Sequence, residues 1–469
     1  MNVAVEQRDE QLCDLRARAR PAAREPVRTH EHRRTDDLRR QPRADRMCPA
    51  EHGVARELSL LLPGQVLDDA GAEAGREPVG GPPLGEIALD HRARLRHPRP
   101  CGGIELDART AARDPNDLLR VHAEPVEPQV VWCTPLVQAG ELIVLTEADV
   151  SRLALTDEEI LGAVEGGLQA QGSGAAKIEP RMHLEPDPAL RGHFNVLRGY
   201  LAPLGLAGVK VIGDYLDNHE RGLPSELGLL TLYDAETGMP VAVVAAAQLT
   251  EMRTGALTAL GARHLARRDS RVLGHVGARG TAYWNVRLLD RLFDFEEIRV
   301  HSRRQESREA FARRLEADLG KPVRVTESWE ACLRGADVMV EASRLERPEP
   351  RLETSWVEPG CLVIPYGTMS AVELSLTDVM DKVVVDDWGQ AHAGALGALR
   401  AHVDTGRLTE QTLYAELCQI VVGDRPGRES DEERILFWHR GLSLSDIALG
   451  HALVEKARRA GIGTTVQLL

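Results

Sequence analysis

The sequence predicts an α/β protein in which a parallel-sheet domain is inserted into a second, discontinuous α/β domain. From Ser270 onward, short apolar runs alternate with amphipathic segments, a pattern typical of parallel strands and their crossover helices. Residues 177–250 instead indicate several short strands separated by turns. The last amphipathic segment, 443–461, is expected to pack back onto the first domain, which would then be built from two separate parts of the chain.

Length and composition narrow the class of protein. A chain of 469 residues with 43% apolar and 28% charged residues fits two or three soluble globular domains. A net charge of −14 argues against a nucleic-acid partner. No apolar run approaches the ~18 residues of a membrane span, and no secretory signal is recognised. Because the seven cysteines lack CxxC spacing, we expect no metal site or disulfide framework, and we predict a cytoplasmic protein.

Residues 1–140 do not have the composition of a folded domain. Trp132 is the first aromatic residue and Lys177 the first lysine, while arginine, proline and acidic residues crowd the stretch. We expect a disordered extension, or the product of a reading frame annotated from too far upstream. An arginine-rich arm that binds nucleic acid is the functional alternative, but interspersed acids and missing aromatics weaken it.

The first ordered elements are expected from Glu141. A strand at 141–145 precedes a helix capped by Thr146, and Thr156 with Glu159 forms a capping box for a helix that extends to about Gln171. Strands are then predicted at 192–197, 208–212, 228–233 and 240–247, with a helix at 249–266.

The parallel sheet is predicted from six strands and four helices. The strands lie at 272–276, 298–301, 323–325, 337–342, 361–365 and 382–386, and the helices at 282–292, 307–319, 328–334 and 413–420. The predicted domains are 141–266 plus 443–469 for the substrate and dimerisation domain, and 267–442 for the inserted one.

A glycine turn opens the inserted domain. The run Gly277-Ala278-Arg279-Gly280-Thr281 lies between a predicted strand and a predicted helix. Glycines there let a dinucleotide pyrophosphate approach the backbone, and the helix N-terminus favours its negative charge. Arg279 stands where a glycine is usual, and it could contact the pyrophosphate or obstruct it. The alternative is an ordinary turn between strand and helix.

The end of the next predicted strand indicates which dinucleotide is preferred. An NAD site carries an acidic residue there, which binds the ribose diol. This chain has Ser302, Arg303 and Arg304 instead, and guanidinium groups pair well with a phosphate. We therefore predict NADP(H), with NAD(H) possible; alternatively, the two arginines belong to a solvated helix start.

Three basic residues could bind and activate a substrate. Lys210 lies in an apolar strand, where a partly desolvated ammonium group can donate a proton or polarise a carbonyl, although it could instead reach solvent. Arg253, at a helix start, suits a carboxylate or phosphate, or else pairs with Glu251 or Asp234. Arg181 is a second carboxylate clamp or a surface residue.

Several motifs together resemble the ornithine cyclodeaminase/mu-crystallin family over about residues 142–463. They include Pro180-Arg181, Gly208-Val209-Lys210, Gly222-Leu223-Pro224, Asp234-x-x-Thr237-Gly238-x-Pro240, Thr250-x-x-Arg253-Thr254-x-Ala256, Ala336-Asp337-Val338, Gly423-x-x-Pro426-Gly427-Arg428 and Gly441-Leu442-x-Leu444-x-Asp446.

The resemblance implies a homodimer with a Rossmann-type NAD(P)-binding domain inserted into the substrate domain. It also implies a small α-amino or α-imino acid as substrate. By position, Arg181 and Arg253 would hold the substrate carboxylate, and Lys210 would lie beside the reacting α-carbon. The residues expected along the cofactor are Ser225, Thr254, Gly277, Ala278, Arg279, Gly280, Thr281, Ser302, Arg303, Arg304, Ser343 and Gly367.

Departures from the family pattern indicate which of the family's activities to expect for this chain. Cyclodeaminases carry an aspartate base where this chain has Gly367, and the run Trp438-His439-Arg440 is also unusual. The leading prediction is an NAD(P)H-dependent oxidoreductase acting on a small imino or keto acid. The alternatives are ornithine cyclodeaminase itself and a non-catalytic protein that binds NADP(H) as a structural ligand.

Overall fold

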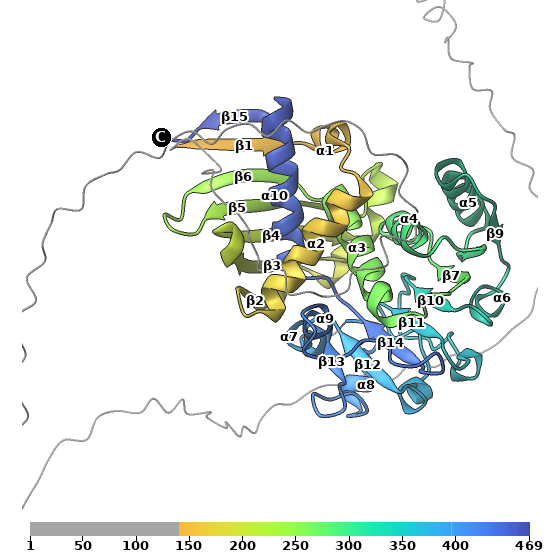
Figure 1. Ribbon diagram of the computed structural model, residues 1–469. Helices are drawn as coiled ribbons and strands as arrows, with labels where there is room; N and C mark the ends of the chain where they lie inside the picture. Colours follow the sequence, from red (N-terminus) through yellow and green to blue (C-terminus); the bar gives the residue numbers. More distant parts are fainter. Residues whose placement is uncertain (1–139, 395) are drawn as a thin grey trace, which may run out of the picture. The chain divides into compact units, whose positions relative to one another are not determined.

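The computed structural model describes residues 140–394 and 396–469, in which two sheets are each accompanied by helices (Figure 1). The predicted N-terminal extension, 1–140, lies outside the described residues except for Gly140. Among the described helices, none is long and apolar enough to cross a membrane. The predicted α/β class is confirmed, and the two predicted domain ranges stay a prediction.

The first sheet has seven strands in the order β15-β1-β6-β5-β4-β3-β2. All neighbours pair antiparallel except β1 and β6. The strands β2 and β15 were not predicted, and the others were predicted to within a few residues. The strands are β1 (Glu141–Leu145), β2 (Ala176–Leu184), β3 (Gly192–Leu201), β4 (Leu206–Tyr215), β5 (Glu226–Asp234), β6 (Pro240–Ala245) and β15 (Thr464–Gln467).

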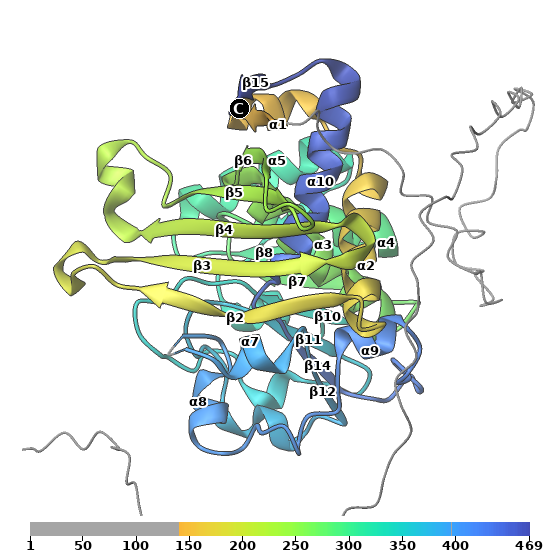
Figure 2. The ribbon, with the colours of Figure 1, turned by 90° about the vertical axis from the view of Figure 1, so that its left-hand side faces the viewer.

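Helices cover one face of this sheet, and Figure 2 shows its other face toward the viewer with the helices behind. Both predicted helix starts are confirmed. Thr156 accepts from the backbone N–H of Glu159 at 3.2 Å, and the Glu159 side chain accepts from the backbone of Thr156 at 2.8 Å. These helices are α1 (Glu147–Leu153), α2 (Asp157–Gly172), α3 (Ala247–Leu265) and α10 (Ser443–Ala460).

The second sheet has eight parallel strands in the order β13-β12-β14-β11-β10-β7-β8-β9. Two of its strands were not predicted, β13 (Ala415–Glu416) and β14 (Ile435–Trp438). The predicted helix at 413–420 is partly wrong, because β13 occupies its first half and α9 (Leu417–Val421) begins after it. The remaining strands are β7 (Val272–Val276), β8 (Glu297–His301), β9 (Val323–Val325), β10 (Val338–Glu341), β11 (Leu362–Pro365) and β12 (Lys382–Val385).

The helices that accompany the second sheet are mostly short. Three of the four predicted helices are confirmed with shifts of one or two residues at their ends, as α4, α5 and α6. The helices are α4 (Ala282–Phe293), α5 (Gln305–Leu319), α6 (Trp329–Leu333), α7 (Trp388–His392) and α8 (Arg400–Asp404).

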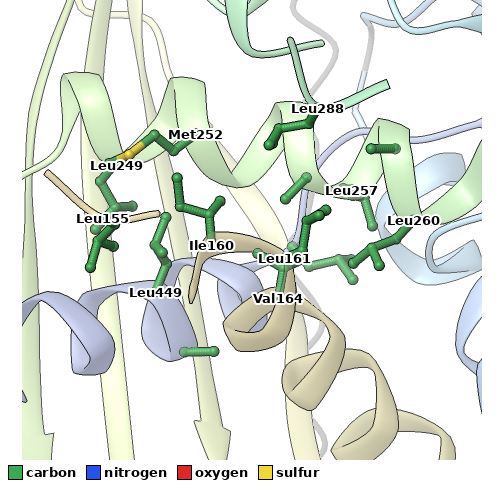
Figure 3. Packing of buried hydrophobic residues seen from close by; sticks show 14 of the residues in the cluster. Leu155, Ile160, Leu161, Val164, Leu249, Met252, Leu257, Leu260, Leu288 and Leu449 are labelled. Atoms are coloured by element: carbon green, nitrogen blue, oxygen red, sulfur yellow. The ribbon is translucent and has the colours of Figure 1, made fainter. Parts of the chain in front are cut away.

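Helix α3 joins the two halves of the core. Its Leu257 packs in one cluster with Ile160 of α2, Leu288 of α4 and Leu449 of α10, all fully buried (Figure 3). Gly255 lets α3 approach α4, since a Cβ there would lie 2.6 Å from the backbone carbonyl carbon of Trp284. This close packing fixes the first turns of α3 at the carboxyl edge of the parallel sheet.

Gly255→Ala should lower the free energy of unfolding by about 1–3 kcal/mol, because the added methyl group meets backbone that cannot move aside. Gly162→Ala is the matched control: Gly162 is exposed in α2 with open space around it, so alanine should stabilise by about 0.5–1 kcal/mol. Denaturant unfolding of both variants measures the difference. Equal stability of the two would contradict the packing described for α3.

Candidate active site

A cavity of about 1240 Å³ lies where the two sheets meet, and it collects side chains from both. Lys210 comes from β4, Arg253 from α3, and Gly277 follows β7. All fifteen site residues expected from the sequence line this cavity: Arg181, Lys210, Ser225, Arg253, Thr254, Gly277, Ala278, Arg279, Gly280, Thr281, Ser302, Arg303, Arg304, Ser343 and Gly367. The structure thus brings these residues together, and their roles in catalysis and binding stay a prediction.

A buried ionic triad forms one wall. Lys210 Nζ lies 2.6 Å from Asp446 Oδ1, and Arg253 Nε lies 2.8 Å from the same oxygen. Lys210 also donates to Thr250 Oγ1 at 3.1 Å. Lys210 is 1% exposed, Arg253 6% and Asp446 0%. The carboxylate that pairs with Arg253 is therefore that of Asp446, in α10, and not Glu251 or Asp234 as considered from the sequence.

The pKa of the Lys210 ammonium group lies close to neutral pH. Burial, together with the charge of Arg253, lowers the pKa of Lys210 to about 7, and Asp446 opposes both effects. Lys210 can thus gain and lose a proton under ordinary conditions. The triad carries two positive charges and one negative charge, which leaves it attractive to an anion.

Arg181 adds a third cation to this wall. Its guanidinium donates to the backbone oxygens of Arg440 and Gly441, the latter at 2.9 Å, and its Nε has no partner among the described residues. Burial, together with the charges of Arg440 and Arg253, lowers the pKa of Arg181 to about 9. Arg181 is therefore part of the cavity wall and not a surface residue.

The glycine turn has the backbone that a phosphate cradle requires. Gly277 has φ +115° and Gly280 has φ +55°, a region that favours glycine. A Cβ at Gly277 would lie 2.5 Å from the carbonyl oxygen of Ala342. Arg279 is exposed and lines the cavity, so its side chain does not fill the turn. The N-terminus of α4 follows at once.

A second wall consists of aromatic and neutral polar groups at the ends of β11 and β14. Tyr366 and His439 stack with ring centroids 4.6 Å apart. The Tyr366 hydroxyl lies 2.6 Å from Thr281 Oγ1, which ties this wall to the glycine turn. No role was predicted for Tyr366, His439 and Asp446. A polar residue after an apolar strand, or in the first turn of an apolar helix, is the signal that could have found them.

Several buried polar atoms on the cavity wall have no partner among the described residues. They are Arg181 Nε, Asn195 Oδ1, Thr368 Oγ1, Trp438 Nε1 and His439 Nδ1; Asp446 Oδ2, in the triad but outside the cavity lining, also has none. Because buried polar groups are normally hydrogen-bonded, this wall is built to be completed by a polar ligand. The cradle at Gly277 and these free atoms together fit a dinucleotide beside a small acid.

Glu341 occupies the space next to Gly367. Its carboxylate accepts from the backbone of Ser343 at 2.8 Å and of Gly367 at 3.2 Å, and burial raises the pKa of Glu341 to about 7. A Cβ at Gly367 would lie 2.6 Å from both carboxylate oxygens and 2.8 Å from the carbonyl oxygen of Ser343. Glycine at 367 and glutamate at 341 are thus mutually dependent.

Comparison with known proteins agrees with this geometry. The sequence model of the ornithine cyclodeaminase/mu-crystallin family matches residues 141–461. An alanine dehydrogenase of Archaeoglobus fulgidus is 31% identical over 330 residues, which are 70% of this chain and 98% of that one.

Two solved structures are similar in fold and in sequence. The Δ1-pyrroline-2-carboxylate reductase of Thermococcus litoralis, in complex with NADH and L-proline, has a TM-score of 0.65 at 26% identity, covering 69% of this chain and 100% of that one. An archaeal alanine dehydrogenase dimer with bound NAD has a TM-score of 0.64 at 28% identity, covering 70% and 100%.

Gly367→Asp should lower the free energy of unfolding by about 1–3 kcal/mol, because the new carboxylate meets that of Glu341 and the Ser343 backbone. Adding Glu341→Ser to the same chain removes the like charge and should recover part of the loss. Chemical denaturation of the single and double variants measures both effects. A single variant as stable as the parent would show that the two positions are independent.

Proposed function

Because the chain belongs to the ornithine cyclodeaminase/mu-crystallin family, we propose that it is an NAD(P)H-dependent oxidoreductase that acts on a small α-imino or α-keto acid. The observation that carries the proposal is the convergence of Arg181, Lys210 and Arg253 on the cavity that the glycine turn also lines. The relatives named above, an alanine dehydrogenase and a pyrroline-carboxylate reductase, act on substrates of this class.

Substrate binding and proton transfer would be carried out by different side chains. Arg181 and Arg253 would hold the substrate carboxylate, since paired guanidinium groups suit a planar acid. Lys210 Nζ would then lie beside the α-carbon and hold the proton that the substrate nitrogen receives. A bound nicotinamide cofactor supplies the hydride in such reactions. The residues of this chain that would hold the dinucleotide are the turn at Gly277, Ser225, Thr254 and Ser343.

We propose NADP(H) as the preferred cofactor, with NAD(H) as the alternative. Arg303 and Arg304 are exposed after β8 and line the cavity, next to Ser302. No carboxylate lies in that run to bind a ribose diol. The two solved relatives carry NADH and NAD, so the preference rests on these arginines alone.

A homodimer through the first sheet is proposed as well. Val211 and Leu229, opposite each other on β4 and β5, are 39% and 53% exposed, and Leu227 and Met182 extend the patch to 41% and 55% exposed residues. The helices lie on the other side of this sheet (Figure 2), so the apolar face has no cover from the described chain.

We also propose a cytoplasmic location. Free, buried Cys332, Cys361 and Cys418 suit a reducing compartment.

Imine reduction should need protonated Lys210. With NADPH and a cyclic imino acid, kcat/KM should therefore fall as pH rises through about 7, the pKa to which burial brings Lys210. Asp446→Asn should move this fall to lower pH, because it removes the negative charge that raises the Lys210 pKa. Lys210→Ala should lose roughly 10²–10⁴-fold in rate while NADPH still binds.

The same assays decide between the activities. NADPH binding without turnover on any imino or keto acid would favour a non-catalytic binding protein, whereas full activity of Lys210→Ala would contradict the role proposed for Lys210. Release of ammonia and proline from ornithine without added reductant would establish a cyclodeaminase.

The cofactor preference is tested by replacing both arginines after β8. The double variant Arg303→Ser/Arg304→Ser should bind NADPH about tenfold or more weakly, since each guanidinium pairs with a phosphate dianion, and should leave NADH affinity unchanged. Fluorescence titration of both cofactors measures this. Arg313→Ser, which changes an exposed arginine of α5 outside the cavity lining, is the matched control. An equal loss for both cofactors would contradict the assignment.

A further inference from the structure

The imidazole of His439 is held rigidly in the cavity wall. It follows β14, is 1% exposed, and lies between the Tyr366 ring at 4.6 Å and the Phe437 ring at 5.2 Å between centroids. Its Nε2 lies 3.0 Å from Thr258 Oγ1, whereas its Nδ1 has no partner among the described residues. Both ring nitrogens therefore have defined surroundings.

The hydrogen-bond network determines which nitrogen carries the hydrogen. The Asn285 amide nitrogen donates to His275 Nε2 at 3.1 Å and to the Tyr366 hydroxyl, so its oxygen is an acceptor. Thr258 has one hydroxyl hydrogen and three acceptors within reach: that oxygen and the Thr254 carbonyl, each 3.1 Å away, and His439 Nε2 at 3.0 Å. Giving this hydrogen to His439 would leave the buried Asn285 oxygen without a donor among the described residues, so we assign the hydrogen to Asn285 and Nε2–H of His439 as the donor to Thr258.

The remaining nitrogen of His439 is thus a lone-pair acceptor. Burial and the nearby charge of Arg253 lower the pKa of His439 to about 3, so the ring stays neutral at ordinary pH. The groups packed around it, Tyr366, Thr258 and Asn285, are themselves uncharged. A buried acceptor without a donor is costly, which indicates that a ligand supplies one.

We propose that His439 Nδ1 accepts a hydrogen bond from an N–H group of the bound ligand. The inference rests on the proposed function, which offers two such groups: the carboxamide of the nicotinamide ring and the α-nitrogen of an amino acid or of an acyclic imino acid. His439 has Tyr366 on one side and Arg253 of the substrate wall nearby. Tyr366 is in turn hydrogen-bonded to Thr281 of the glycine turn. His439 therefore selects ligands with an N–H group over analogues without one.

Two nearly isosteric variants separate the ring nitrogens. His439→Asn places a carbonyl oxygen near the Nδ1 position, and His439→Gln places its amide near Nε2, where it can still reach Thr258. The proposal expects His439→Gln to lose about tenfold in affinity for the ligand that carries the N–H group, and His439→Asn to retain most of it. Kd for NADPH and KM for an amino acid, oxidised with NADP⁺, are measured for both variants, with thermal unfolding as the check on folding.

Analogues without the N–H group identify its source and do not depend on any variant. Weaker binding of reduced 3-acetylpyridine adenine dinucleotide phosphate than of NADPH by the parent enzyme, with no further loss in His439→Gln, supports the carboxamide. An unchanged Kd for NADPH with a raised KM for the amino acid, but not for the matching keto acid, supports the α-nitrogen.

Two results overturn the inference. If His439→Gln matches the parent on both ligands and the parent does not distinguish the analogues, His439 makes no ligand contact, although the proposed function stands. If the parent neither binds NADPH nor turns over imino acids, the proposed function fails and the inference fails with it.

Discussion

The carboxylate of Asp446 is the interaction on which the rest of the site depends. It neutralises one of two cations, Lys210 and Arg253, that approach each other inside the protein. Removing one member of such a buried group typically costs about 3–5 kcal/mol, because uncompensated charge stays buried. The same carboxylate joins α10 to β4 and α3, so the final helix of the chain is fixed onto the first sheet by the groups that would bind substrate.

The part of this structure that could be predicted is the part that neighbouring residues determine. The capped helix starts at Thr146 and Thr156 and the glycine turn at Gly277 each follow from a few consecutive residues. Alternating strands and helices from Ser270 onward also follow from local periodicity. The family resemblance grouped Arg181, Lys210 and Arg253, which are far apart in the sequence and line one cavity; local patterns alone could not have done this.

What could not be predicted depends on contacts between distant residues. Asp446 lies 193 residues from Arg253 and 236 from Lys210, so nothing near either basic residue marks it as their partner. Strand β14, Ile435–Trp438, is only four residues long and inserts between β11 and β12, which precede it in the chain. The acceptor role of His439 follows from Thr258 and Asn285, whose hydrogen-bonding is fixed only after α3 and α4 pack together.

The two walls of the cavity differ in charge, and this difference bears on the reaction. Arg181, Lys210 and Arg253 form a cationic wall on the side of the first sheet. The opposite wall is neutral at ordinary pH, because burial raises the pKa of Tyr366 and lowers that of His439. The carboxylate of Glu341, next to Gly367, accepts hydrogen bonds from the backbone of Ser343 and Gly367 and does not line the cavity. In the cationic wall, Lys210 is the group whose pKa lies near neutral pH, which suits a reduction that needs one proton.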